Sequence, residues 1–144
     1  MSVKNILYLN KLSGFTDLSL LALRLLTGAF LVWGVWDNIL HQERMTEFIA
    51  FMTQFGFPYP ALLAPLSVWM QFICGLLLCV GLFTRWAGLL MVFNFVVGFL
   101  MVHLGDDFRA QFPALILIGV NLHFVAVGGG RFALDRVFGG GETR

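Results

Sequence analysis

The chain has 144 residues, of which 59% are hydrophobic and 12% are charged, and its formal net charge is +1 at pH 7. An ordinary soluble domain carries about 25% charged residues, so this composition excludes a typical soluble protein. The near-neutral charge gives no indication of a nucleic-acid partner. We therefore expect a polytopic membrane protein that forms a single transmembrane domain over residues 1–144.

The first apolar stretch of membrane length covers residues 18–40. Residues 5–16 before it mix polar and apolar side chains and are expected to lie along the membrane interface. The stretch is too long for the apolar core of a signal peptide, so we expect it to remain as an anchor. It carries two charged residues, Arg24 and Asp37. Charges at membrane depth cost roughly 2.5–3.5 kcal/mol each on insertion scales, which makes both residues functional candidates. They lie roughly 20 Å apart along a helix and mark two separate polar locations.

The next segment predicts an amphipathic helix on the outer face over about 43–55, because Met45, Phe48 and Met52 recur at three- and four-residue steps. A re-entrant segment is the alternative. Three further spans follow before a short tail, at about 61–83, 86–104 and 110–128, with the tail at 131–144. Because the turns between them are short, we predict an all-α, integral membrane four-helix bundle with antiparallel helices. Small residues would allow close helix contacts: Gly28, Gly34, Gly75, Gly88, Gly98 and Gly119.

The positive charges predict the orientation of these spans. If the N-terminus is cytoplasmic, six of the nine Lys and Arg residues lie inside, two lie outside and Arg24 lies in the membrane. Cytoplasmic loops carry an excess of Lys and Arg. We therefore expect both termini in the cytoplasm.

Polar and aromatic side chains gather near the outer ends of the first three spans. Asp37 follows Trp33 and precedes His41 by four residues each, and Arg44 follows three residues later, which places them on one helical stripe. Residues on the second and third spans lie at compatible depths. This pattern predicts a ligand-binding pocket, whereas the alternative is a set of helix ends that face headgroups and water. The candidate ligand-binding residues are Trp33, Trp36, Asp37, His41, Gln71 and His103.

Metal and catalytic motifs are weak in this sequence. His41 and His103 are expected at a similar depth in the membrane, and bis-histidine haem ligation is chemically feasible. A metal site would need further ligands, however, and only Asp37 is near. We therefore expect no metal and no haem. The sequence has no Gly-rich phosphate loop and no Ser/His/Asp arrangement, so no motif supports catalysis by this chain alone. Cys74 and Cys79 are expected to remain free thiols.

A second polar set lies toward the inner face and comprises Arg24, Asn121, His123 and Asp17. Arg24 could snorkel outward to the membrane surface, or it could satisfy carbonyls or Asn121 inside the bundle. We expect a structural role for this set. Asn94, in the middle of the third span, is expected to form a hydrogen bond between helices.

Four segments together resemble the DoxX family of small bacterial four-helix inner-membrane proteins: Leu23–Gly34, Phe55–Pro58 with Ala64–Leu66, Gln71–Arg85, and Phe132–Asp135. The resemblance implies four spans with cytoplasmic termini in the bacterial cytoplasmic membrane. The family is named for membrane subunits linked to thiosulfate and quinone oxidation. The resemblance therefore implies a redox accessory role, with quinone as the candidate cofactor and a membrane or periplasmic protein as the candidate partner. Two positions depart from the family pattern, since Asp37 stands where a lysine is usual and Gln71 where a glutamate is usual.

Two functions from different classes follow. The first is a redox accessory subunit that binds a quinone or similar molecule, or docks a periplasmic partner, at the outer pocket. The alternative is a non-catalytic assembly or interaction protein without a ligand. Transport is disfavoured, because four helices without broken segments or repeats make a poor alternating-access device.

Overall fold

The computed structural model describes residues 9–139, and every regular element in that part of the chain is helical. Residues 5–8 of the expected interfacial stretch and residues 140–144 of the expected tail lie outside the described residues. Four of the helices are long and apolar enough to cross a membrane, so the predicted all-α membrane fold is confirmed. The elements in chain order are η1 (Asn10–Phe15), α2 (Thr16–Leu40), α3 (Gln42–Gln54), α4 (Pro60–Val80), α5 (Thr84–Gly98), η2 (Phe99–His103), α6 (Phe108–Val127) and α7 (Asp135–Phe138).

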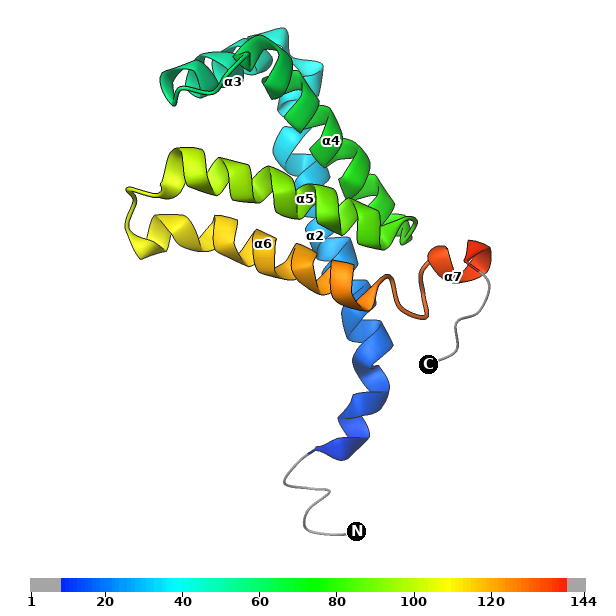
Figure 1. The fold of residues 1–144 in the computed structure, drawn as a ribbon. Coiled ribbons are helices and arrows are strands. Elements are labelled where there is room, and N and C mark those ends of the chain that lie inside the picture. Colours follow the sequence, from blue (N-terminus) through cyan, green and yellow to red (C-terminus); the bar gives the residue numbers. More distant parts are fainter. Residues whose placement is uncertain (1–8, 140–144) are drawn as a thin grey trace.

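The helices pack as two antiparallel pairs, α2 with α4 and α5 with α6, and α4 also contacts α5 (Figure 1). All four helices contribute to one apolar core: Leu20, Leu31, Cys74, Leu78, Ala87, Met91 and Phe124. In Figure 1 the α5–α6 pair lies across α2, and its connecting turn points away from α4. The two pairs therefore share a core near one end and diverge toward the other.

Glycines set the closest approach within each pair. A Cβ added to Gly28 would lie 2.5 Å from the carbonyl oxygen of Gly75, and a Cβ added to Gly75 would lie 2.8 Å from that of Gly28. A Cβ added to Gly88 on α5 would lie 2.8 Å from the carbonyl oxygen of Asn121 on α6. The remaining three predicted contact glycines have no such neighbour within 4 Å, namely Gly34, Gly98 and Gly119. Of the six glycines predicted to allow close helix contacts, three therefore lie at such contacts.

The amphipathic helix predicted after the first span is α3. His41 separates α2 from α3, because its backbone is extended (φ −119°, ψ 112°) and does not continue the helix. Met45 and Met52 are buried against the ends of α2 and α4, where they form a second apolar cluster with Val35, Ala64 and Val68. We call this end of the bundle the α3 end, and the opposite end, where α7 lies, the α7 end (Figure 1).

Candidate functional site

A cavity of about 280 Å³ opens at the α3 end, between α3, α4 and the α5–η2 segment. Its wall is almost entirely apolar and includes Phe48, Met52, Leu63, Met70, Phe95 and Val102. Its polar groups come from Ser67, Gln71, Asn94 and His103. An apolar pocket with a few converging polar groups is the usual form of a small-molecule site.

Three of the polar side chains form a hydrogen-bonded chain that joins α4 to α5. The Ser67 hydroxyl donates to Asn94 Oδ1 at 2.8 Å, and Gln71 Nε2 donates to Ser67 Oγ at 3.2 Å. Ser67 and Gln71 are four residues apart on α4 and so share one face of that helix. Within the described residues, no hydrogen bond reaches Gln71 Oε1 or involves Asn94 Nδ2, so the chain offers a ligand one acceptor and one donor.

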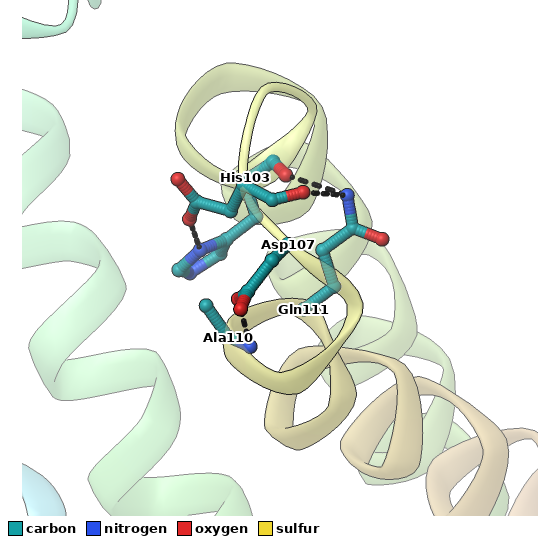
Figure 2. A network of polar contacts seen from close by, with 5 residues as sticks. His103, Asp107, Ala110 and Gln111 are labelled. Carbon is teal, nitrogen blue, oxygen red and sulfur yellow. Dashed lines mark hydrogen bonds and ion pairs between the residues drawn. The ribbon is translucent and has the colours of Figure 1, made fainter.

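His103 lies where the third span ends, in the π-helical turn η2. Its Nδ1 is 2.8 Å from Asp106 Oδ2. Figure 2 shows His103 together with Asp107, Ala110 and Gln111 at this turn. The Gln111 side chain ties this turn together by donating to the carbonyl oxygens of His103 and Asp106, each at 3.0 Å. Asp107 caps α6 by accepting from the Ala110 N–H at 3.0 Å. In the neutral tautomer whose Nδ1–H donates a hydrogen bond to Asp106, Nε2 of His103 is a hydrogen-bond acceptor beside the cavity.

The six candidate residues do not form one cluster. Gln71 and His103 line the cavity. Trp33 and Trp36 instead border an open hollow between α2 and α4, with Trp33 78% exposed. Asp37 and His41 are exposed, and within the described residues no side-chain hydrogen bond or ion pair involves either of them.

The end of α2 at Leu40 separates Arg44 from the predicted stripe. The predicted stripe assumed one continuous helix from Trp33 through Arg44. The extended backbone of His41 ends α2 and changes the direction of the chain before Arg44 is reached. Arg44 pairs with Glu47 at 3.1 Å rather than with Asp37. Gln71 likewise pairs with Ser67 rather than with Asp37. Asp37 and Gln71, the two residues that depart from the family pattern, are thus not hydrogen-bonded to each other.

A family model, described as DoxX, matches residues 19–104. The match extends from α2 to the start of the turn after η2, includes most of the cavity wall, and covers more than half of the chain. The chain belongs to the DoxX family. Searches of the curated proteins and of the solved structures found no match.

The second polar centre of this DoxX-family protein lies at the α7 end and is built around Arg24. The Arg24 side chain is 0% exposed, so it does not snorkel to the surface. Nη2 donates to the carbonyl oxygen of Phe132 at 3.1 Å, which agrees with the alternative in which Arg24 satisfies backbone carbonyls. Four buried side-chain atoms have no hydrogen-bond partner among residues 9–139: Arg24 Nε, Arg24 Nη1, Thr84 Oγ1 and Asn121 Oδ1.

The other members of the predicted inner set have separate environments. Asn121 Nδ2 donates to the Leu117 carbonyl on its own helix at 2.8 Å, not to Arg24. His123 is exposed beside Phe124, with the ring centroids 6.4 Å apart. Asp17 accepts from the backbone N–H of Arg131 at 3.0 Å. Cys74 and Cys79 are free, and among the described residues no group of three His, Cys, Asp or Glu side chains is placed to hold a metal ion.

Sequence reasoning identified part of the cavity and missed the rest. Ser67 and Gln71 could be placed on one polar face from their spacing of four residues. Asn94 was expected only as a link between helices, and it does bond to α4 through Ser67. Its position in the cavity, and the wall that α3 supplies, depend on how far the two helix pairs diverge. No local pattern in the sequence carries that information.

Proposed function

We propose that this DoxX-family protein is an accessory subunit of a membrane redox system and that its α3-end cavity binds a quinone or a similar small molecule. The observation that carries the proposal is the Gln71–Ser67–Asn94 chain, which presents a free acceptor and a free donor in an apolar cavity. A quinone ring is apolar on its faces and has carbonyl oxygens at its edge, which become hydroxyls on reduction. Asn94 Nδ2 would donate to a ring carbonyl, and Gln71 Oε1 would accept from a hydroxyl.

The size of the cavity supports the binding of a ring rather than of a long tail. Its volume of about 280 Å³ is close to the lower limit of small-molecule pockets, which are roughly 300–1,000 Å³. A hydrocarbon tail would extend into the surrounding lipid. His103 would act at the mouth of the cavity, where it could accept a hydrogen bond through Nε2. We assign no catalytic residue.

We also propose that the protein lies in the bacterial cytoplasmic membrane with both termini in the cytoplasm and the α3 end outside. The excess of Lys and Arg toward the α7 end supports this orientation. The expected result is that a reporter enzyme active only outside the membrane is inactive when fused after residue 144 and active when inserted at 104–107. The reverse pattern would rule the orientation out.

Extraction of bound molecules tests the ligand. We expect organic extracts of the protein, purified in mild detergent, to contain quinone in proportion to the protein, and the Asn94→Leu variant to lose most of it. Asn38→Leu is the matched control, because Asn38 donates to the Arg44 carbonyl and does not line the cavity. A quinone-free extract together with a stably co-purifying protein would favour the alternative, an assembly protein without a ligand.

A further inference from the structure

The Asp135 carboxylate sits in a cradle of backbone N–H groups at the α7 end. Its two oxygens accept from the N–H of Phe83 at 2.6 Å and from the N–H of Thr84 at 2.9 Å. Phe83 has a left-handed backbone (φ 49°, ψ 38°) and Thr84 begins α5. Successive N–H groups in such a left-handed to right-handed pair converge on one point and form an anion-binding concavity. The N-terminus of a 15-residue helix adds its positive dipole at the same place.

Two fully buried side chains beside this cradle have unused hydrogen-bond donors. Arg24 and Thr84 are each 0% exposed. In the part of the chain that the structure describes, Arg24 Nε, Arg24 Nη1 and Thr84 Oγ1 have no hydrogen-bond partner. Arg24 also interacts electrostatically with Asp135. Glycines make room for both donors. A Cβ on Gly81 would collide with Arg24 Nη1, and one on Gly129 would lie 3.3 Å from that atom and 2.8 Å from Thr84 Oγ1. The donors around this point therefore exceed what the two oxygens of one carboxylate accept.

The Asp135 carboxylate belongs to the segment that follows α6. Residues 128–138 return to the ends of α2, α4 and α5, and Figure 1 shows α7 beside the ends of α4 and α5. The segment is held mainly by polar contacts, which include Asp135 N–H to the Gly81 carbonyl at 2.9 Å and Arg131 N–H to Asp17 Oδ1 at 3.0 Å. Ala133 is its one buried apolar side chain within the described residues. Its other large apolar side chains are exposed, so little apolar surface opposes its release.

We propose that the backbone N–H groups of Phe83 and Thr84, the Thr84 hydroxyl and Arg24 form a binding site for a phosphate-class anion, and that Asp135 occupies this site as an internal surrogate. A phosphate group presents more acceptor oxygens than a carboxylate, so it can meet the N–H pair, the hydroxyl and the guanidinium together. Release of residues 128–138 exposes the site. The group bound is either free phosphate or the headgroup of a phospholipid, since both present the same oxygens.

Chemical rescue tests the site. Asp135→Ala removes the surrogate, and we expect the variant in detergent to unfold at a lower temperature than the unmodified chain. Inorganic phosphate at saturation should then raise its melting temperature by about 5 °C, and that of the unmodified chain by clearly less, because Asp135 competes. Adding Thr84→Val to Asp135→Ala should raise the half-saturating phosphate concentration about fivefold or more, because one donor is lost.

Two sets of controls accompany the phosphate titrations. Potassium chloride at equal ionic strength and the Glu47→Ala variant, which lacks an exposed carboxylate, should show no such rescue. Phosphatidylglycerol is compared with diacylglycerol: rescue by phosphatidylglycerol alone identifies a lipid headgroup site, and rescue by inorganic phosphate identifies a site for the free ion. If Asp135→Ala does not fold, Asp135→Asn takes its place in the same titrations. Absence of rescue, or equal rescue of Glu47→Ala, would overturn the proposal and leave Asp135 as a helix cap only.

Discussion

Replacing Arg24 by leucine is expected to destabilise the fold by about 1.5–3 kcal/mol, the usual contribution of a hydrogen bond made by a charged group. The guanidinium is fully buried, donates to the Phe132 carbonyl and interacts electrostatically with Asp135. Its loss leaves the carbonyl without its donor and removes a positive charge that favours the carboxylate. Equilibrium unfolding in mixed detergent micelles, followed by far-UV circular dichroism, measures the change.

Arg44→Leu is the matched control for this experiment. Arg44 pairs with Glu47 at 3.1 Å on the surface of α3, and exposed ion pairs contribute about 0–1 kcal/mol. A double-mutant cycle of Arg24→Leu with Asp135→Leu should show a coupling energy of about 1 kcal/mol or more, because the two charges interact. If Arg24→Leu costs no more than Arg44→Leu, the buried centre does not hold the α7 end together.

Gly28→Ala is expected to destabilise the fold, whereas Gly34→Ala is expected to leave its stability level or raise it, although both replace a glycine on α2. A Cβ at residue 28 would lie 2.5 Å from the Gly75 carbonyl oxygen and 2.6 Å from Cys79 Sγ, so α2 and α4 must separate. Overpacking of this kind costs about 1–3 kcal/mol. A Cβ at residue 34 meets nothing within 4 Å, and alanine in a helix is favoured over glycine by roughly 0.5–1 kcal/mol.

Thermal unfolding of the two variants in the same detergent measures this difference directly. The melting temperature should fall for Gly28→Ala and stay level or rise for Gly34→Ala. Equal loss in both variants would mean that helix flexibility, and not the contact between α2 and α4, is what glycine provides in this helix.

The helices could be predicted from the sequence because they depend on local properties. Membrane-length apolar runs and the three- and four-residue steps of Met45, Phe48 and Met52 are visible without a structure. The role of individual glycines could not be predicted in this way. Gly28 and Gly34 have similar apolar surroundings in sequence. They differ because Gly28 lies against Gly75 on another helix, whereas Gly34 has no such neighbour.

The candidate site was predicted in part for the same reason. Gln71 and Ser67 share a helix, so their spacing was enough to place them on one face. The link between Asp37 and Arg44 assumed that α2 continues past residue 40, and the extended backbone of His41 ends the helix there. The hydrogen-bond acceptor of Arg24 is the Phe132 carbonyl, which lies 108 residues away in the chain. Long-range contacts of this kind leave no periodic signal in the sequence.

Binding of a short-chain quinone to the purified protein in lipid nanodiscs tests the proposed function most directly. The unmodified chain should bind it saturably, and Gln71→Leu should raise the Kd about tenfold, as expected when a ligand hydrogen bond worth about 1.4 kcal/mol is lost. Gln54→Leu is the matched control, because Gln54 is exposed on α3 and does not line the cavity, and its Kd should be unchanged. Absence of saturable binding by the unmodified chain, or the same Kd for all three proteins, would contradict the assignment of this cavity as the ligand site.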